Sequence, residues 1–565
     1  MMSTVTEWVR FSQRRITLVL SVLVLVVLVV APLGMLTVGS FLDEPPGQAS
    51  AVTLDNYGEV VGKDFAELLG NSVLIAVGST LFAMLLGAAL AVTMVRTDLP
   101  WRRFFGAAVL VPAYVTPFIG AICWTVLLSP DVGYINNWLA ALGVGPLNIY
   151  SMPGIIWVLG LYLTPVAYLY LLPALLRLDR SFEEAGRATG ATMRQTARHV
   201  ILPLLRPAVL SAALIILVQA IGDFAVPAVL GRHAGVEVIT TEIVRMTGSY
   251  PADPNGAAVF GIVLAVVTLL VLGINHLLIR RADFTTITSR GVQLATSKSR
   301  TWRVVGTAGV ALYLLVAIVL PLGVMLVASF QPYLTTDFTS VGLTFANYEY
   351  VASFPAIGRA IRNSVVLALG AAVTTTLLGV LLGYLIARAG VRGAGVVNYL
   401  STSPLAIPHT VFGLAMLWTW VTIPVGIYGS PWILFIAYVG LFLPFSVIPA
   451  VAAFRQVDPS LEDAARLFGT TWLGAVRKVV IPLIAPALLS GAIIVIYHAV
   501  RELSASILLY TPNNEVISVS MFSMLSEGRY VQVFALSVVN VGLVLALVAV
   551  SNVVGRRYRA TTESL

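Results

Sequence analysis

SFEEAGRATGATMRQTARHVILPLLRP (residues 181–207) and SLEDAARLFGTTWLGAVRKVVIPLIAP (residues 460–486) are two copies of one polar, arginine-rich stretch in a strongly apolar chain. The copies are offset by 279 positions, and with the four residues after each they agree at 14 of 31 positions. The shared residues include Gly190 and its counterpart Gly469. A polar stretch that recurs at a fixed offset indicates that the chain contains an internal duplication.

A second, apolar pair of segments extends the duplication. Residues 71–96 and 363–388 share 10 of 26 positions, and each segment begins with Asn-Ser and ends with arginine. We therefore expect two homologous halves arranged head to tail, residues 1–290 and 291–565, that cross a membrane in the same direction. The polar linker of residues 280–303 is predicted to contain their boundary.

The composition places the chain in a lipid bilayer. Of its 565 residues, 58% are hydrophobic and only 11% are charged, which gives more apolar surface than a soluble protein of this length can bury. Apolar runs of spanning length, about 20 residues each, begin near Ile16, Asn71, Phe104, Gly154, Ala208, Ala257, Val304, Asn363, Val396, Pro431, Ala487 and Val531. The predicted fold class is an all-α integral membrane protein with about 12 transmembrane helices in two homologous parallel six-span halves.

Prolines predict where some of these spans bend. A proline inside a helix removes one backbone hydrogen bond and allows a kink. The third span contains Pro112 and Pro117, and the ninth contains Pro404 and Pro408. We therefore expect kinks at equivalent places in the two halves.

The positive charges predict the orientation. Arginine and lysine stay in cytoplasmic loops, and here they concentrate in the N-terminal segment, the two polar stretches, the linker and the C-terminal segment. Both termini and both polar stretches are therefore predicted to be cytoplasmic. The net charge of +8 follows from this topology, so the expected partner is the lipid bilayer and no nucleic acid.

The repeated stretch reads as two short helices joined by a turn. Acidic residues near Ser181 favour a helix start there, and Gly190 permits a sharp turn. A second, basic helix over residues 193–200 then leads to Pro203 and Pro207, which mark the entry into the fifth span. We call the resulting helix-turn-helix segments the first elbow (residues 181–207) and the second elbow (residues 460–486).

The spacing within the elbows resembles the EAA loop of permease subunits of type I ATP-binding-cassette importers. The matching positions are Glu184, Ala185, Gly186 and Gly190 in the first elbow and Asp463, Ala464, Ala465 and Gly469 in the second. This sequence departs from the family pattern at two of them, since Gly186 replaces an alanine and Asp463 replaces a glutamate.

The resemblance implies a function and a set of partners. In that family the EAA segment is the coupling helix, which enters a groove on a cytoplasmic ATPase subunit, so two elbows imply two ATPases. ATP and magnesium would then be held by those subunits, with no cofactor in this chain, and an extracytoplasmic solute-binding protein would deliver the solute. The location implied is the bacterial inner (plasma) membrane, where the chain would be a multi-pass protein.

The sequence indicates the class of transporter more strongly than it indicates the transported solute. A single chain with both elbows resembles the fused permeases of the ferric-iron uptake group, whose relatives handle thiamine, polyamines and aminoethylphosphonate. The rival class is an ion-coupled secondary transporter, which can also have twelve spans in two parallel halves. A membrane enzyme is a third alternative, but the sequence offers no clustered catalytic constellation and no ATPase motif, so we expect a transport subunit.

Polar residues at membrane depth are the candidates for the translocation pathway. Asp223 and Glu502 align under the offset of 279, as do Gln219 and His498, and Arg501 precedes Glu502. Asp223 is predicted to lie in the fifth span and Glu502 in the eleventh, and the spacing of i, i+4 puts each polar pair on one helix face. Ionisable residues in a membrane face a cavity or a partner. These residues are therefore expected either to line the pathway or to clasp neighbouring spans together.

Overall fold

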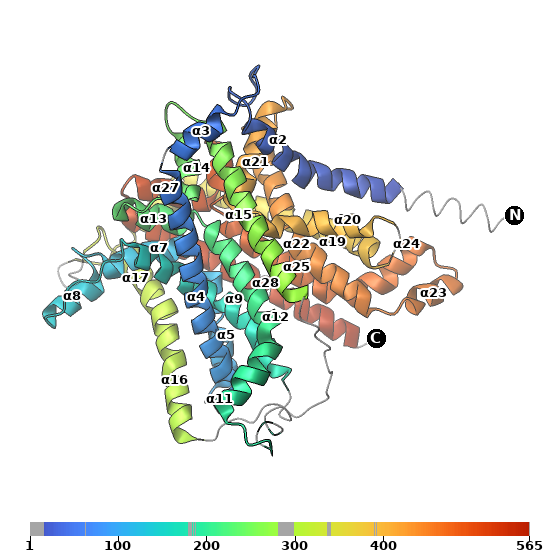
Figure 1. Cartoon of the computed structure of the whole chain (residues 1–565), viewed down its shortest axis with the longest axis horizontal. Helices are drawn as coiled ribbons and strands as arrows, with labels where there is room; N and C mark the ends of the chain where they lie inside the picture. Colours follow the sequence, from blue (N-terminus) through green and yellow to red (C-terminus); the bar gives the residue numbers. More distant parts are fainter. Residues whose placement is uncertain are drawn as a thin grey trace. The chain divides into compact units, whose positions relative to one another are not determined.

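The computed structural model describes residues 16–62, 64–178, 184, 186, 188–280, 299–335, 341–388, 390 and 392–563. Within these ranges the chain is almost wholly helical, and ten helices are long and apolar enough to cross a membrane (Figure 1). They are Ile16–Gly39, Phe65–Arg96 (α4), Met152–Leu176 (α9), Arg194–Ile221, Pro254–Asn275, Arg300–Ser329, Pro355–Ala387 (α19), Pro431–Gln456 (α22), Val476–Arg501 and Tyr530–Leu547. Most of the predicted linker lies outside the described residues.

Two further spans are broken helices. Residues Arg102–Tyr114 and Pro117–Leu128 (α7) meet at 94°, and residues Ala394–Ala406 and His409–Thr422 (α21) meet at 112°. The breaks fall at the prolines of the third and ninth runs, which confirms the kinks expected there. Counting each broken pair as one span gives up to 12 spans within the described residues, so the all-α class with about 12 transmembrane helices is confirmed.

Among the residues that the structure describes, four spans contain one wide, π-helical turn followed by a proline. A proline ring collides with the carbonyl four residues earlier, and a π turn relieves this collision because its hydrogen bonds reach one residue further back. The turns are Val26–Val30 (η1), Ala197–Ile201 (η2), Leu315–Val319 (η3) and Val476–Val480 (η5). The helices that follow are Ala31–Gly39 (α2), Leu202–Ile221 (α12), Leu320–Ser329 (α17) and Ile481–Arg501 (α25), each with proline as its second residue.

The chain forms two compact units. Unit 1 comprises Met1–Gly62, Ile243–Ile262 and Tyr348–Leu565, and unit 2 comprises Lys63–Glu242 and Val263–Asn347. In unit 2, helices α4, α9 and α12 pack against one another, and in unit 1 their counterparts α19, α22 and α25 do the same. The two halves of the duplication therefore have the same three-helix core.

Glycines allow the close packing of these cores. A Cβ atom on Gly87 of α4 would lie 2.4 Å from the Cβ of Ala167 on α9. A Cβ atom on the equivalent Gly379 of α19 would lie 3.0 Å from the Ser446 carbonyl oxygen on α22. A side chain at Gly87 would force α4 and α9 apart, and one at Gly379 would require a shift of α22, so glycine permits the close approach at both crossings.

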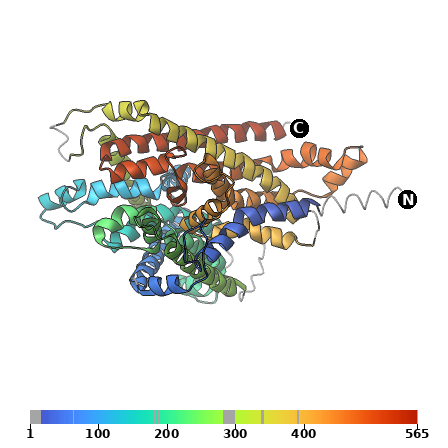
Figure 2. The ribbon, with the colours of Figure 1, turned by 90° about the horizontal axis from the view of Figure 1, so that it is seen from above.

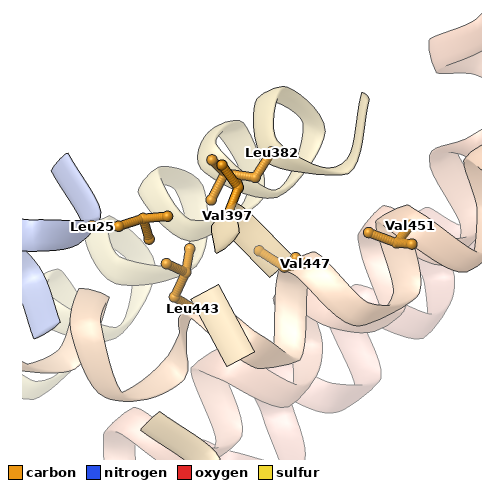
Figure 3. Packing of buried hydrophobic residues seen from close by; sticks show 6 residues of the cluster. All are labelled: Leu25, Leu382, Val397, Leu443, Val447 and Val451. Atoms are coloured by element: carbon orange, nitrogen blue, oxygen red, sulfur yellow. The ribbon is translucent and has the colours of Figure 1, made fainter. Parts of the chain in front are cut away.

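The first span of each sequence half packs within the other half's unit. In unit 1, the N-terminal helix packs on α21 and α22, and Figures 1 and 2 show it in dark blue beside orange helices. Its residue Leu25 joins the buried cluster of Leu382, Val397, Leu443, Val447 and Val451 (Figure 3). In unit 2, residues Arg300–Leu314 (α16) pack on α4, and α17 packs on α7. The compact units thus differ from the halves 1–290 and 291–565, which remain a prediction about the repeat.

Candidate functional site

The second elbow is a helix, a glycine turn and a second short helix. Residues Ser460–Leu467 (α23) form the first helix, Phe468 caps its C-terminal end, and Gly469 then adopts a left-handed φ of +83°. The Thr470 N–H donates to the Ala465 carbonyl at 3.3 Å and closes the turn. The Gly474 N–H then donates to the Thr471 hydroxyl at 3.2 Å, which caps the start of the second helix.

The first elbow repeats this turn. Gly190 has a φ of +76°, and the Ala191 N–H donates to the Gly186 carbonyl at 3.0 Å. Thr192 and Gln195 form a reciprocal cap, in which the Gln195 side chain accepts from the Thr192 N–H at 2.8 Å. The glycine turn predicted in both elbows is confirmed. Ala185 lies outside the described residues, and the role of the elbows as ATPase contacts stays a prediction.

A paired change of size separates the two elbows. A Cβ atom on Gly186 would lie 2.5 Å from the Thr196 hydroxyl oxygen, and Thr196 is buried. At the equivalent positions the second elbow has Ala465 and Ala475. The first elbow therefore requires glycine because threonine occupies the space where the alanine methyl group would lie.

Arg388, at the end of α19, ties the second elbow to the core of unit 1. Its guanidinium donates to the Val457 carbonyl and its Nε lies 3.9 Å from Oε1 of Glu462, in the first turn of α23. Nearby, the Ser460 N–H donates to Asp458 at 2.8 Å, and this hydrogen bond lowers the pKa of the Asp458 carboxyl. From the sequence, Arg388 is only the arginine that ends the second apolar segment, and nothing in that segment indicates its partner.

The acids Asp223 and Glu502 lie just beyond their spans. Helix α12 ends at Ile221 and α25 ends at Arg501, so the expected placement of both acids inside the fifth and eleventh helices is wrong. Gly222 caps α12, and the chain then turns. The i, i+4 argument for a shared helix face therefore does not apply to either acid.

Each acid instead caps the next turn of chain. The Val226 N–H donates to Asp223 Oδ1 at 2.8 Å, at the start of Ala225–Ala234 (α13). The Ala505 N–H donates to Glu502 Oε1 at 2.9 Å, just before Ser506–Leu509 (α26). In both places the carboxylate accepts from the backbone N–H three residues later, as an N-cap side chain does, although Phe224 and Ala505 are the residues that directly precede the two helices. The two halves thus have the same acid-capped break after their long span.

Equivalent hydrogen bonds in the two halves also hold the main chain at these breaks. The Thr240 hydroxyl donates to the Asp223 carbonyl at 2.9 Å, and the Ser518 hydroxyl donates to the Glu502 carbonyl at 2.5 Å. The Asn-Ser dipeptides that begin the apolar repeat contribute equivalent bonds: Asn71 donates to the Glu237 carbonyl and Asn363 donates to the Glu515 carbonyl, both at 3.0 Å. The shared Asn-Ser motif therefore holds the segments that follow the breaks.

The acid of the second half, Glu502, contacts a histidine. His409 begins α21, at the break of the ninth span, and its Nδ1 lies 2.6 Å from Glu502 Oε2. Glu502 is 6% exposed and both of its carboxylate oxygens have partners. The pair joins the end of α25 to the start of α21. Sequence reasoning missed His409, whose only signal is a histidine next to Pro408 inside an apolar run.

The other polar candidates have different surroundings. His498 stacks on Phe445, with ring centroids 4.6 Å apart, and the Arg501 guanidinium lies 4.6 Å from the centre of the Tyr497 ring. Gln219 is exposed on α12. Their roles in a pathway stay predictions. Among the described residues, no three His, Cys, Asp or Glu side chains form a group that could hold a metal ion.

Comparison with known proteins agrees with this duplicated architecture. The family of binding-protein-dependent transport system inner membrane components matches the chain twice, over residues 79–284 and 376–560. The chain belongs to this family. The first match ends after the acid-capped break and contains the first elbow, and the second match contains the second elbow. The two matches thus contain both elbows and both acid-capped breaks.

Similar members of the family include permeases named for ferric transport. The chain is 26% identical to the ferric transport system permease protein FbpB of Actinobacillus pleuropneumoniae, over 78% of this chain and 64% of that protein. It is 28% identical to a putative FbpB 1 of Haemophilus influenzae, over 72% of this chain and 64% of that protein. The matched region thus covers 64% of the length of each of these relatives.

Other relatives carry different names. A molybdate/tungstate transport system permease protein WtpB of Pyrococcus abyssi is 30% identical over 33% of this chain and 75% of that protein. A solved bacterial importer of the polysaccharide alginate is 21% identical, with a TM-score of 0.38 over 44% of this chain and 90% of that one.

Proposed function

We propose that this chain is the transmembrane subunit of an ATP-driven, binding-protein-dependent importer and that its solute is ferric iron. The observation that carries the class is the presence, on one chain, of two elbows with the same glycine turn, each leading into a long span. The family assignment supports the class, and the two FbpB relatives support iron. Under this proposal both elbows and both termini lie on the cytoplasmic side of the bacterial inner membrane.

The geometry suggests how an elbow transmits force. Helix α25 contains 21 residues, about 30 Å at 1.5 Å per residue. The second elbow leads into one end of it through η5, and the capped break at Glu502 lies at the other end. Because a helix moves as a rigid element, displacement of the elbow by an ATPase would be delivered to the contact between Glu502 and His409. Helix α12 would connect the first elbow to Asp223 in the same way.

Two roles are open to the acids within this mechanism. Carboxylates are ligands that a hard cation such as Fe³⁺ prefers, so Asp223 and Glu502 could serve as transient contacts for a passing ion. The bonds of Glu502 to Ala505 and His409 favour a clasp at that residue, because no carboxylate oxygen is left without a partner in this conformation. We propose that Glu502 holds α21 against α25 and is released when the elbow moves.

Uptake by a reconstituted system tests the proposal. The chain, its ATPase and its binding protein would be placed in liposomes and offered radioactive ferric iron, molybdate, thiamine or putrescine in separate assays. ATP-dependent uptake of iron alone is the expected result, with a hydrolysis-deficient ATPase as the control. Uptake of another solute would overturn the assignment of iron. Uptake driven by an ion gradient without ATP would overturn the class in favour of a secondary transporter.

A further inference from the structure

Unit 2 carries a short helix whose apolar side chains are exposed. Residues Tyr134–Ala141 (α8) lie between α7 and α9. Trp138 is 76% exposed and Leu142, directly after the helix, is 77% exposed. At a spacing of i, i+4 these two side chains lie on one face. The exposed apolar surface continues along the loop through Val144 and Leu147.

This segment has no charged residue. From Val132 to Pro153 the sequence contains no Asp, Glu, Lys or Arg. Surfaces that bind soluble proteins have a polar rim around an apolar centre. This segment has no charged residue that could form such a rim. Tryptophan is enriched at membrane–water interfaces, where its amphipathic ring lies at the level of the lipid head groups.

Hydrogen bonds hold α8 beside the end of α7 and near the start of α9, two membrane-spanning helices. The side-chain nitrogen of buried Asn136 lies 3.1 Å from the carbonyl oxygen of Leu128, the last residue of α7, and 2.8 Å from that of Ser129. Asn136 also exchanges two hydrogen bonds with Leu147, of 2.8 and 2.9 Å, shortly before α9 begins at Met152. The helix is thus fixed at the level where these helices end.

A second attachment leads to another span. The Tyr134 hydroxyl donates to the Thr335 carbonyl at 2.7 Å, and Thr335 follows the end of α17 at Ser329. The distribution of arginine predicts that this end of α17 and the start of α9 lie on the extracytoplasmic side. Both attachments therefore place α8 near the outer surface of the bilayer.

We propose that α8 is an interfacial helix that rests in the outer leaflet, with Trp138 and Leu142 inserted among the lipids. The occupant of this apolar face is the lipid surface, because the hydrogen bonds of Tyr134 and Asn136 hold the face at the level where membrane-spanning helices end, and the face has no charges with which to recognise a soluble partner. The equivalent connection of the second half, residues 423–430, is short and has no such helix. The proposed contact is therefore a property of one half and does not depend on the solute.

Fluorescence quenching in lipid nanodiscs tests this contact. In a Cys123→Ala background, Trp138→Cys would be labelled with an environment-sensitive fluorophore and exposed to lipids spin-labelled near the top of the acyl chain, or to iodide in water. Phe468→Cys in the second elbow is the matched control, since Phe468 is an aromatic residue that is 93% exposed outside the spans. We expect lipid quenching at position 138 to be roughly threefold stronger than at position 468, and iodide quenching to be weaker, because an interfacial helix buries its apolar face by several ångströms.

A second variant keeps the test independent of Trp138. With the label at Val144→Cys, the change Leu142→Glu should reduce lipid quenching, because a carboxylate is unfavourable among acyl chains. Equal iodide quenching at positions 138 and 468, with no lipid quenching at 138, would overturn the proposal. So would a label at position 138 that is quenched by iodide until the binding protein is added, since this outcome assigns the face to a soluble partner.

Discussion

At the scale of single residues, a paired change of size distinguishes the two elbows. Gly186 faces the buried Thr196 in the first elbow, whereas Ala465 and Ala475 hold these positions in the second. A threonine side chain is stiff at χ1 because it branches at Cβ, so it has little freedom to move away from an added methyl group. The departure of Gly186 from the family pattern is thus explained by its neighbour.

The change Gly186→Ala should therefore destabilise the first elbow, and a second change should compensate. Overpacking of a filled site costs about 1–3 kcal/mol, which we expect as a lower melting temperature of the purified chain. The double variant Gly186→Ala with Thr196→Ala recreates the pairing of the second elbow and should recover most of the loss. Additive effects of the two changes in this double-mutant cycle would show that the residues do not share one site.

The glycine turns give a second residue-scale prediction. An added side chain at Gly190 or Gly469 meets no neighbour within 4 Å, but both residues have a positive φ, so a substitution there acts through backbone strain. Gly469→Val should weaken co-purification with the ATPase, because a left-handed conformation costs roughly 1–2 kcal/mol in most residues. Gly469→Asn is the control, since asparagine tolerates this conformation. Equal retention of the ATPase by both variants would contradict a requirement for the turn.

At the scale of elements, the sequence predicted which segments form helices better than it predicted the residues at which those helices end. The runs that begin near Asn71 and Pro431 became single spans, because long apolar segments fix helices whatever their neighbours. The end of α25 before Glu502 was missed, since the cap on Ala505 and the contact with His409 join residues that no local pattern connects. The turn at Gly469 was predicted because a glycine at a fixed place in a repeat is itself a local signal.

The two capped breaks can be tested by removing the charge of each acid. In Asp223→Asn the amide oxygen can still accept from the Val226 N–H, so this cap should be kept. Glu502→Gln removes a charge-assisted hydrogen bond to His409, worth about 1.5–3 kcal/mol, and should lower the melting temperature clearly. Flux per folded molecule would be measured on the same preparations. A loss of flux in both variants at unchanged melting temperature would instead place the acids in the translocation pathway.

At the scale of the whole molecule, the first span of each half belongs to the unit of the other half. Sequence could not predict this exchange, because the first spans are apolar around their whole circumference and indicate no partner. A Cβ atom added at Gly39 would lie 2.7 Å from the Trp418 ring, and a Cβ atom added at Gly306 would lie 2.9 Å from Cγ2 of Thr93. Both contacts depend on the exchanged arrangement.

Matched glycine substitutions test the exchange. Gly39→Ala and Gly306→Ala should each lower the melting temperature, since the new methyl group needs space that Trp418 or Thr93 occupies. Gly34→Ala and Gly309→Ala lie in the same two spans with nothing within 4 Å, and they should be neutral or slightly stabilising because alanine favours a helix. Equal effects within each pair would contradict the packing of the first spans described here.

The number of ATPase subunits bound by one chain tests the central claim most directly. Two elbows on one 60.2 kDa polypeptide predict a complex of one chain with two ATPases, which native mass spectrometry of the detergent-solubilised assembly would measure. Gly469→Val should shift the population toward one ATPase per chain, since only the second elbow is altered. A wild-type complex that holds a single ATPase, or none, would contradict the account of this chain as a permease with two coupling elbows.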